Sequence, residues 1–276
     1  MGNAASSQHQ GPLHASQSLA AEYSDKAVAY AKKWAPVIQP MAKPIFAALP
    51  LRTADTVLDV GAGTGSMLTD ISALAPLALT AGIDRAEGML RVARDAGWKT
   101  VAVADARQLC IRSASIDVGL LIFVLFHLPD PVEGLREIRR VLRPGGCAGI
   151  VVWGTDPGAP GASIWTEELN REGAAPDPRD QSVMQAGLMN TPEKLASLVQ
   201  SSGLKVHKLW SEMFCHPFKV DDLLGVQLGC GVAARRLPNL TAEARARCER
   251  RVRDRLEKFS EAELEYRPEV LFAVVG

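Results

Sequence analysis

Residues 57–65 read VLDVGAGTG, a short apolar run that leads directly into a turn with three glycines. A helical pattern follows at once, with Met67, Leu68, Ile71 and Leu74 at the spacing of one helix face. Glycine tolerates positive φ and lets a ligand approach the backbone, and the N-terminus of the next helix offers free N–H groups to an anionic group. The stretch therefore predicts a buried strand, a ligand-binding turn and a helix.

The same order of strand and helix repeats along the chain. Further apolar runs are separated by helical patterns, and they are found at residues 78–83, 100–104, 118–123 and 148–153. Residues 205–214 can form another strand, and residues 270–275 supply the last one. Strands that are apolar on both faces and alternate with helices are typical of a parallel sheet covered by helices. Asp130-Pro131 and Thr191-Pro192 are helix N-cap signals within this pattern.

A glycine turn alone does not identify the ligand, because dinucleotides and S-adenosylmethionine both bind such turns. Residues 61–66 read GAGTGS, so Ser66 stands where the dinucleotide fingerprint requires Gly or Ala. Asp84 ends the second strand, where a carboxylate can accept hydrogen bonds from ribose hydroxyls. Asp105 ends the third strand, where it can accept from an adenine amino group while the N–H of Ala106 donates to the ring.

This combination resembles the class I S-adenosylmethionine-dependent methyltransferases, and most closely their small-molecule group with the quinone-biosynthesis enzymes. Residues 84–94 and 142–146 are similar to further family segments. The resemblance implies an α/β, Rossmann-like, doubly wound sheet of seven strands, mostly parallel with an antiparallel last strand. It also implies a cofactor site made by Asp59, Gly61, Ala62, Gly63, Gly65, Asp84, Arg85, Met89, Asp105, Ala106, Ile122 and Phe123.

The end of the fourth strand departs from the family pattern. Leu121, Ile122 and Phe123 stand where the family often has Ser or Asn. His127 follows this strand, where active-site loops of open parallel sheets gather, so it is the candidate general base, with a pKa near neutrality. The competing interpretation is a positioning or structural histidine. No metal-ligand motif accompanies it.

The chain is expected to form one domain with additions. Residues 1–18 lack periodicity and predict a disordered leader, and residues 19–276 the methyltransferase domain. Within it we expect a helical cap at 19–50, a lid or substrate loop at 154–190 and a helical insertion at 221–268. The candidate substrate contacts are Tyr23 and Tyr30 in the cap and Trp165 in the lid, although aromatic residues at this spacing more often only pack.

Charge and composition limit the partners. The 31 basic and 31 acidic residues balance, which disfavours a nucleic-acid partner. Five cysteines without metal or disulfide spacing favour a reducing compartment, the cytoplasm. The longest mainly apolar run, residues 118–128, is about half of the roughly 20 residues that an integral membrane segment requires. Residues 1–6 fit the pattern for an N-myristoyl group on Gly2, but no Lys or Arg supplies a second anchoring signal before Lys26.

The predicted function is methyl transfer from S-adenosylmethionine to a small acceptor by in-line displacement, with release of S-adenosylhomocysteine. The apolar residues 121–126 and the tryptophan of the predicted lid favour a hydrophobic or aromatic acceptor. The alternatives are a protein methyltransferase and a non-catalytic subunit that binds S-adenosylmethionine for regulation or partnership. An NAD-dependent oxidoreductase is a weaker alternative because Ser66 interrupts its fingerprint.

Overall fold

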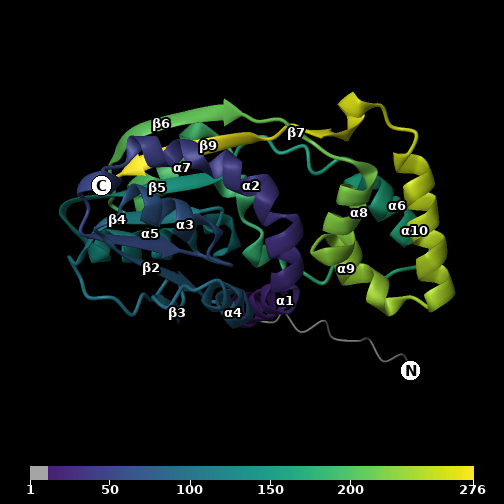
Figure 1. Cartoon of the computed structure of the whole chain (residues 1–276), viewed down its shortest axis with the longest axis horizontal. Helices are drawn as coiled ribbons and strands as arrows, with labels where there is room; N and C mark the ends of the chain where they lie inside the picture. The colour runs from purple at the N-terminus through teal and green to yellow at the C-terminus, as the bar shows by residue number, and fades with distance from the viewer. Residues whose placement is uncertain (1–11) are drawn as a thin grey trace, which may run out of the picture.

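The computed structural model describes residues 12–276 and is built around one seven-stranded sheet (Figure 1). The strands run in the order β3-β2-β1-β4-β5-β9-β6, and β9 pairs antiparallel with both β5 and β6. The predicted sheet with an antiparallel last strand is therefore confirmed. Its strands are β1 Thr56–Val60, β2 Leu79–Asp84, β3 Val101–Val103, β4 Ile116–Ile122, β5 Leu142–Trp153, β6 Val206–Met213 and β9 Glu269–Val275.

Both faces of the sheet are buried. Successive residues of the central strands point to opposite sides, and each side joins a core cluster of its own. Val57 and Leu120 join one core cluster, whereas Leu58 and Leu121 join the other. One face is covered by α3 (Ser66–Leu74) and α4 (Glu87–Asp95), and the other by α5 (Pro131–Val141) and α7 (Pro192–Ser201). The predicted caps form, since Asp130 accepts from the N–H of Val132 and Thr191 from that of Lys194.

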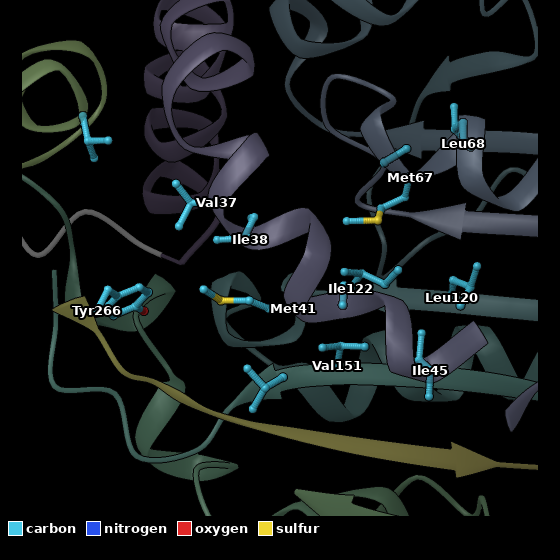
Figure 2. Close-up of a cluster of buried hydrophobic side chains, with 14 of the residues drawn as sticks. Val37, Ile38, Met41, Ile45, Met67, Leu68, Leu120, Ile122, Val151 and Tyr266 are labelled. Carbon is cyan, nitrogen blue, oxygen red and sulfur yellow. The ribbon is translucent and has the colours of Figure 1, made fainter. Parts of the chain in front are cut away.

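The N-terminal helices complete the first face. They are α1 Pro12–Lys33, α2 Ala35–Ala42, η1 Lys43–Ala48 and η2 Leu51–Thr53. Figure 2 shows Val37, Ile38 and Met41 of α2 in a buried cluster with Ile122 and Val151 of the central strands. This packing fixes the cap against the strand whose end carries Phe123.

The expected disordered leader is wrong for residues 12–18, which form the first turns of α1. Ala15 is 4% exposed and packs with Leu19 against Val183 of the 154–190 segment. Tertiary contacts therefore order a stretch whose own sequence has no clear periodicity. The candidate acylation site at Gly2 lies outside the described residues.

A helical lobe stands beside the sheet, on the far side of α1 in Figure 1. It unites the predicted 154–190 segment with the 221–268 insertion, because Glu168 lies 2.6 Å from Arg251 and 3.0 Å from Arg255. A two-stranded sheet that the sequence did not predict, β7 (His216–Pro217) with β8 (Glu265–Tyr266), joins the lobe to the main sheet. The lobe and its flanking turns comprise α6 Ala162–Arg171, η4 Gln181–Val183, η5 Ala186–Leu188, α8 Val220–Gly229, α9 Val232–Arg236, η6 Leu237–Asn239, α10 Ala242–Leu256 and η7 Glu261–Leu264.

No helix within residues 12–276 combines the length and the apolar character that a bilayer crossing requires.

Candidate cofactor site

A cavity opens at the carboxyl ends of β1 to β4 and is roofed by α1. We call it the strand-end cavity. Of the residues predicted to hold a cofactor, the structure brings together here Gly61, Gly63, Asp84, Arg85, Met89, Asp105, Ala106, Ile122 and Phe123. The carboxyl ends of neighbouring parallel strands meet at one edge of the sheet, which explains how residues over 60 positions apart reach one cavity.

The glycine turn has the backbone that its sequence predicts. Gly61, Gly63 and Gly65 all have positive φ, at 80°, 55° and 76°. A Cβ at position 61 would lie 2.5 Å from Cγ2 of Val124, so only glycine fits there without displacing the loop after β4. Gly65 is the N-cap of α3, and neither it nor Ala62 lines the cavity.

Asp84 connects this turn to the second strand. Its carboxylate accepts from the N–H of Gly63 at 2.8 Å and from that of Ala86 at 2.7 Å. Burial raises the pKa of this carboxyl, although the backbone hydrogen bonds work in the opposite direction. Asp84 thus holds the turn and also presents a carboxylate to the cavity.

Asp59 lies behind the turn and does not line the cavity. Its side chain is 2% exposed, and its Oδ1 has no hydrogen-bond partner among the described residues. Burial, together with the neighbouring Asp84 carboxylate, raises the pKa of Asp59 from 3.8 to about 7. A carboxylate in this position is therefore near half ionisation at neutral pH.

The raised pKa of Asp59 predicts a pH dependence of stability. The folded protein binds more protons than the unfolded chain between the unfolded pKa of 3.8 and the folded pKa of about 7. The stabilising contribution is therefore complete below pH 4 and is lost as the pH rises through 7. In Asp59→Asn, which cannot ionise, we expect the free energy of unfolding relative to wild type to increase by about 2–3 kcal/mol from pH 5 to pH 8.

Urea unfolding of both proteins at the two pH values, without added ligand, measures this difference. Asp55→Asn, at a position 88% exposed, is the matched control and should leave the pH dependence unchanged. Parallel pH profiles for Asp59→Asn and wild type would show that Asp59 is ionised throughout.

Asp105 is already engaged by two arginines. It lies 3.1 Å from Nη1 of Arg85 and 2.9 Å from Nη2 of Arg107, whose backbone N–H it also accepts. Burial alone would raise the pKa of this carboxyl, but the hydrogen bonds and charge of Arg107, with that of Arg85, lower it. A carboxylate offers about four acceptor positions, and Nε of Arg107 also donates to Oδ1 at 3.1 Å, so these four donors fill them. An adenine amino group would have to displace one donor, and Arg85 is the one held by a single nitrogen.

The roof of the cavity joins Tyr23 of α1 to His127, which ends η3 (Leu125–His127). The Tyr23 hydroxyl lies 2.9 Å from Nε2 of His127, and Nδ1 lies 3.3 Å from the carbonyl oxygen of Val183. Because a carbonyl only accepts, Nδ1 is assigned the proton and Nε2 accepts from the tyrosine. Burial lowers the pKa of His127 to about 4, so the expected pKa near neutrality is wrong.

Phe123 occupies the strand-4 end in an unusual conformation. Its φ is 53°, in the left-handed region that non-glycine residues rarely adopt. The ring stacks on Trp153 at 4.1 Å between centroids, and its N–H donates to the carbonyl of Val151. Such strain is held by the surrounding contacts and is concentrated at functional sites. An aromatic wall therefore replaces the polar side chain that the family often has here.

The predicted substrate residues separate into two groups. Tyr23 and Tyr30 line the strand-end cavity, whereas Trp165 does not reach it. Trp165 is fully buried in the core of the helical lobe, because the apolar face of α6 packs against α9 and α10. Trp165 therefore lies in the core of the helical lobe and not, as the sequence predicts, in a substrate loop.

Several lining residues were missed by the sequence reasoning. Ser16, Leu19 and Ala20 line the cavity beside Tyr23, on one face of α1. Their i, i+3, i+4, i+7 spacing was the available signal. Ser16 is 5% exposed, and its Oγ has no partner among residues 12–276. This hydroxyl and the Asp84 carboxylate fit a ligand with ribose hydroxyls, and the backbone of the glycine turn lies beside them.

Sheet, glycine turn and acidic strand ends define a Rossmann-like cofactor-binding protein. The model of the methyltransferase domain family matches residues 58–150. A demethylmenaquinone methyltransferase of Corynebacterium kroppenstedtii is 30% identical over 162 residues, covering 56% of this chain and 69% of that protein. The chain belongs to the class I S-adenosylmethionine-dependent methyltransferases, and S-adenosylmethionine is its cofactor.

Other relatives share shorter segments. A 27-O-demethylrifamycin SV methyltransferase of Amycolatopsis mediterranei is 35% identical over 105 residues, covering 36% of this chain and 38% of that protein. The chain thus spans little more than a third of this curated relative, and it spans 30% of a transposon protein of Streptomyces fradiae. The solved [4+2]-cyclase SpnF shares the fold, with a TM-score of 0.53 at 19% identity over 88% of this chain and 82% of SpnF.

Proposed function

We propose that this protein transfers a methyl group from S-adenosylmethionine to a small hydrophobic or aromatic acceptor by in-line displacement, with release of S-adenosylhomocysteine. The observation that carries the proposal is the two-sided strand-end cavity. One side presents the glycine turn and the Asp84 and Asp105 carboxylates, and the other presents Tyr23, Tyr30 and Phe123. The polar side suits the cofactor, and the aromatic side suits an apolar acceptor.

In this proposal different polar residues contact different parts of the cofactor. Asp84 accepts from the ribose hydroxyls, residues 61–65 with Asp59 behind them hold the methionine end, and Asp105 with Ala106 contacts the adenine. Met89, 2% exposed, packs on the adenosine. When bound, the cofactor supplies an electrophilic methyl group on a sulfonium. The chain's own contribution is to orient the acceptor and exclude water.

We further propose that His127 positions Tyr23 and is not the general base. A base works best with a pKa near the working pH, whereas burial holds the pKa of His127 at about 4. Its Nε2 is also occupied by the Tyr23 hydroxyl. The hydrogen bond fixes the tyrosine ring over the cavity, where it contributes shape.

Substitution of His127 tests this role. Loss of a general base costs about 10²–10⁴-fold in rate. For His127→Asn we expect kcat to fall by less than about tenfold, with an unchanged pH profile between 6 and 8, because only the Tyr23 contact is lost. Tyr23→Phe, which removes the same hydrogen bond from the other side, should give the same fall. A loss above 100-fold in His127→Asn alone would identify the histidine as the base.

Methyl-labelled S-adenosylmethionine tests the overall proposal. The purified protein is incubated with it and a lysate of the host, and the label is partitioned among organic extract, protein and nucleic acid. Label in the organic extract is the expected result, and label confined to protein would support a protein methyltransferase instead. Bound cofactor without transferred label would support a non-catalytic subunit.

The cysteine spacing favours a reducing compartment, and we propose that the reaction occurs in the cytoplasm.

A further inference from the structure

A second cavity of about 360 Å³ lies between α1, α6 and the α8–α9 pair. Leu19, Tyr23 and Tyr30 line both this cavity and the strand-end cavity. These three residues of α1 thus lie between the two spaces. Trp34 adds an aromatic wall, and Thr166 of α6 faces the cavity from the opposite side.

The charges that line this second cavity do not balance. Arg235 is 6% exposed, and it contacts Asp177 at 2.9 Å and Glu22 at 3.2 Å. Arg179 contacts the same Asp177 at 3.0 Å, and Lys26 contacts the same Glu22 at 3.3 Å. Three cationic side chains thus share two carboxylates, which leaves one positive charge in excess among the lining residues.

Removal of Arg179 leaves the other pairs intact. Its Nε and Nη2 both donate to Asp177, and Nη1 does not take part in this contact. Asp177 without Arg179 would still be held by Nε and Nη2 of Arg235. The charge of Arg179 also acts on the dividing wall: burial is the main cause that raises the pKa of Tyr23, and Arg179 opposes it.

We propose that the second cavity binds the anionic end of the acceptor, that the reacting end lies in the strand-end cavity beside Tyr23 and Tyr30, and that the acceptor is an aromatic acid. This inference rests on the proposed function and names its substrate class. The rings of Tyr23, Tyr30 and Trp34 contact the aromatic body, and Arg179 binds a carboxylate, sulfonate or phosphate with Lys26 beside it. An excess charge in a partly buried, largely apolar cavity favours an anionic partner, and arginine binds such groups through paired N–H donors.

Two fluorescent probes with one skeleton separate charge from apolar contact. 8-Anilinonaphthalene-1-sulfonate is anionic, and N-phenyl-1-naphthylamine is its neutral counterpart. Both are titrated into the full chain, with and without saturating S-adenosylhomocysteine. We expect wild type to bind the sulfonate at least about tenfold more tightly. Arg179→Gln should remove about tenfold of the sulfonate affinity and leave that of the neutral probe within about twofold.

Two further variants locate the effect. Arg247→Gln removes the same charge from α10, where the arginine pairs with Glu172, and should change neither affinity. Thr166→Trp fills the cavity from α6 and should weaken both probes at least about tenfold. Equal sulfonate affinity in Arg179→Gln and wild type, or sulfonate binding that Thr166→Trp does not weaken, would overturn the proposal. Binding of S-adenosylhomocysteine is measured separately in each variant. If wild type did not bind S-adenosylhomocysteine, that result would count against the proposed function and not against the acceptor site.

Discussion

Asp84→Ala should weaken the binding of S-adenosylhomocysteine about 100-fold, which corresponds to about 2.8 kcal/mol. The carboxylate of Asp84 accepts from the N–H groups of Gly63 and Ala86, and it faces the strand-end cavity. Hydrogen bonds to a charged group contribute about 1.5–3 kcal/mol each, and the substitution also leaves two backbone donors without their acceptor. Both the ribose acceptor and the fixed shape of the turn are therefore lost together.

Isothermal titration of S-adenosylhomocysteine at pH 7.5 measures the effect. Asp84→Asn keeps one acceptor oxygen and should lose about tenfold, which separates loss of charge from loss of the turn. Asp55→Asn, an exposed aspartate near the opposite ends of the strands, is the control for charge alone. If Asp84→Ala retained affinity within threefold, the cofactor would not be held at the end of β2.

Asp84 shows why part of this site could be predicted from the sequence. An acidic residue directly after an apolar run, and a turn with three glycines after another, are local patterns that determine local structure. Parallel strands then bring their carboxyl ends to one edge without further information. The same argument explains the correct prediction of Asp130 as the cap of α5, because an N-cap depends on residues within three positions.

The roof and the helical lobe depend on contacts that local patterns do not specify. Trp165 lies on an apolar face of α6, and periodicity predicts that such a face is covered but not by which partner. The excess charge around Arg179 arises only because α1, the 154–190 segment and α9 converge. Similarly, burial that lowers the pKa of His127 to about 4 comes from the assembled roof and not from its neighbours in sequence.

The docking of this roof depends on one glycine, and Gly88→Ala should separate α1 from α4. A Cβ at position 88 would lie 2.6 Å from Cα of Ser24 in α1, and closer still to its carbonyl oxygen. The N–H of Gly88 also donates to Oγ of Ser24 at 3.1 Å. Because backbone atoms cannot rotate away as a side chain can, the helices must move apart. We expect a loss of about 2–3 kcal/mol in the free energy of unfolding, at the upper end for overpacking.

Because α1 carries Ser16 and Tyr23 over the strand-end cavity, the same substitution should weaken S-adenosylhomocysteine binding about tenfold. Urea unfolding and isothermal titration measure the two effects on one preparation. Gly187→Ala is the matched control, since a Cβ there meets nothing within 4 Å and the glycine does not have a positive φ. Loss of stability with full affinity would mean that α1 stabilises the fold but does not close the cofactor site. Loss of both, with Gly187→Ala unchanged, would show that contact between α1 and α4 is required for a closed cavity.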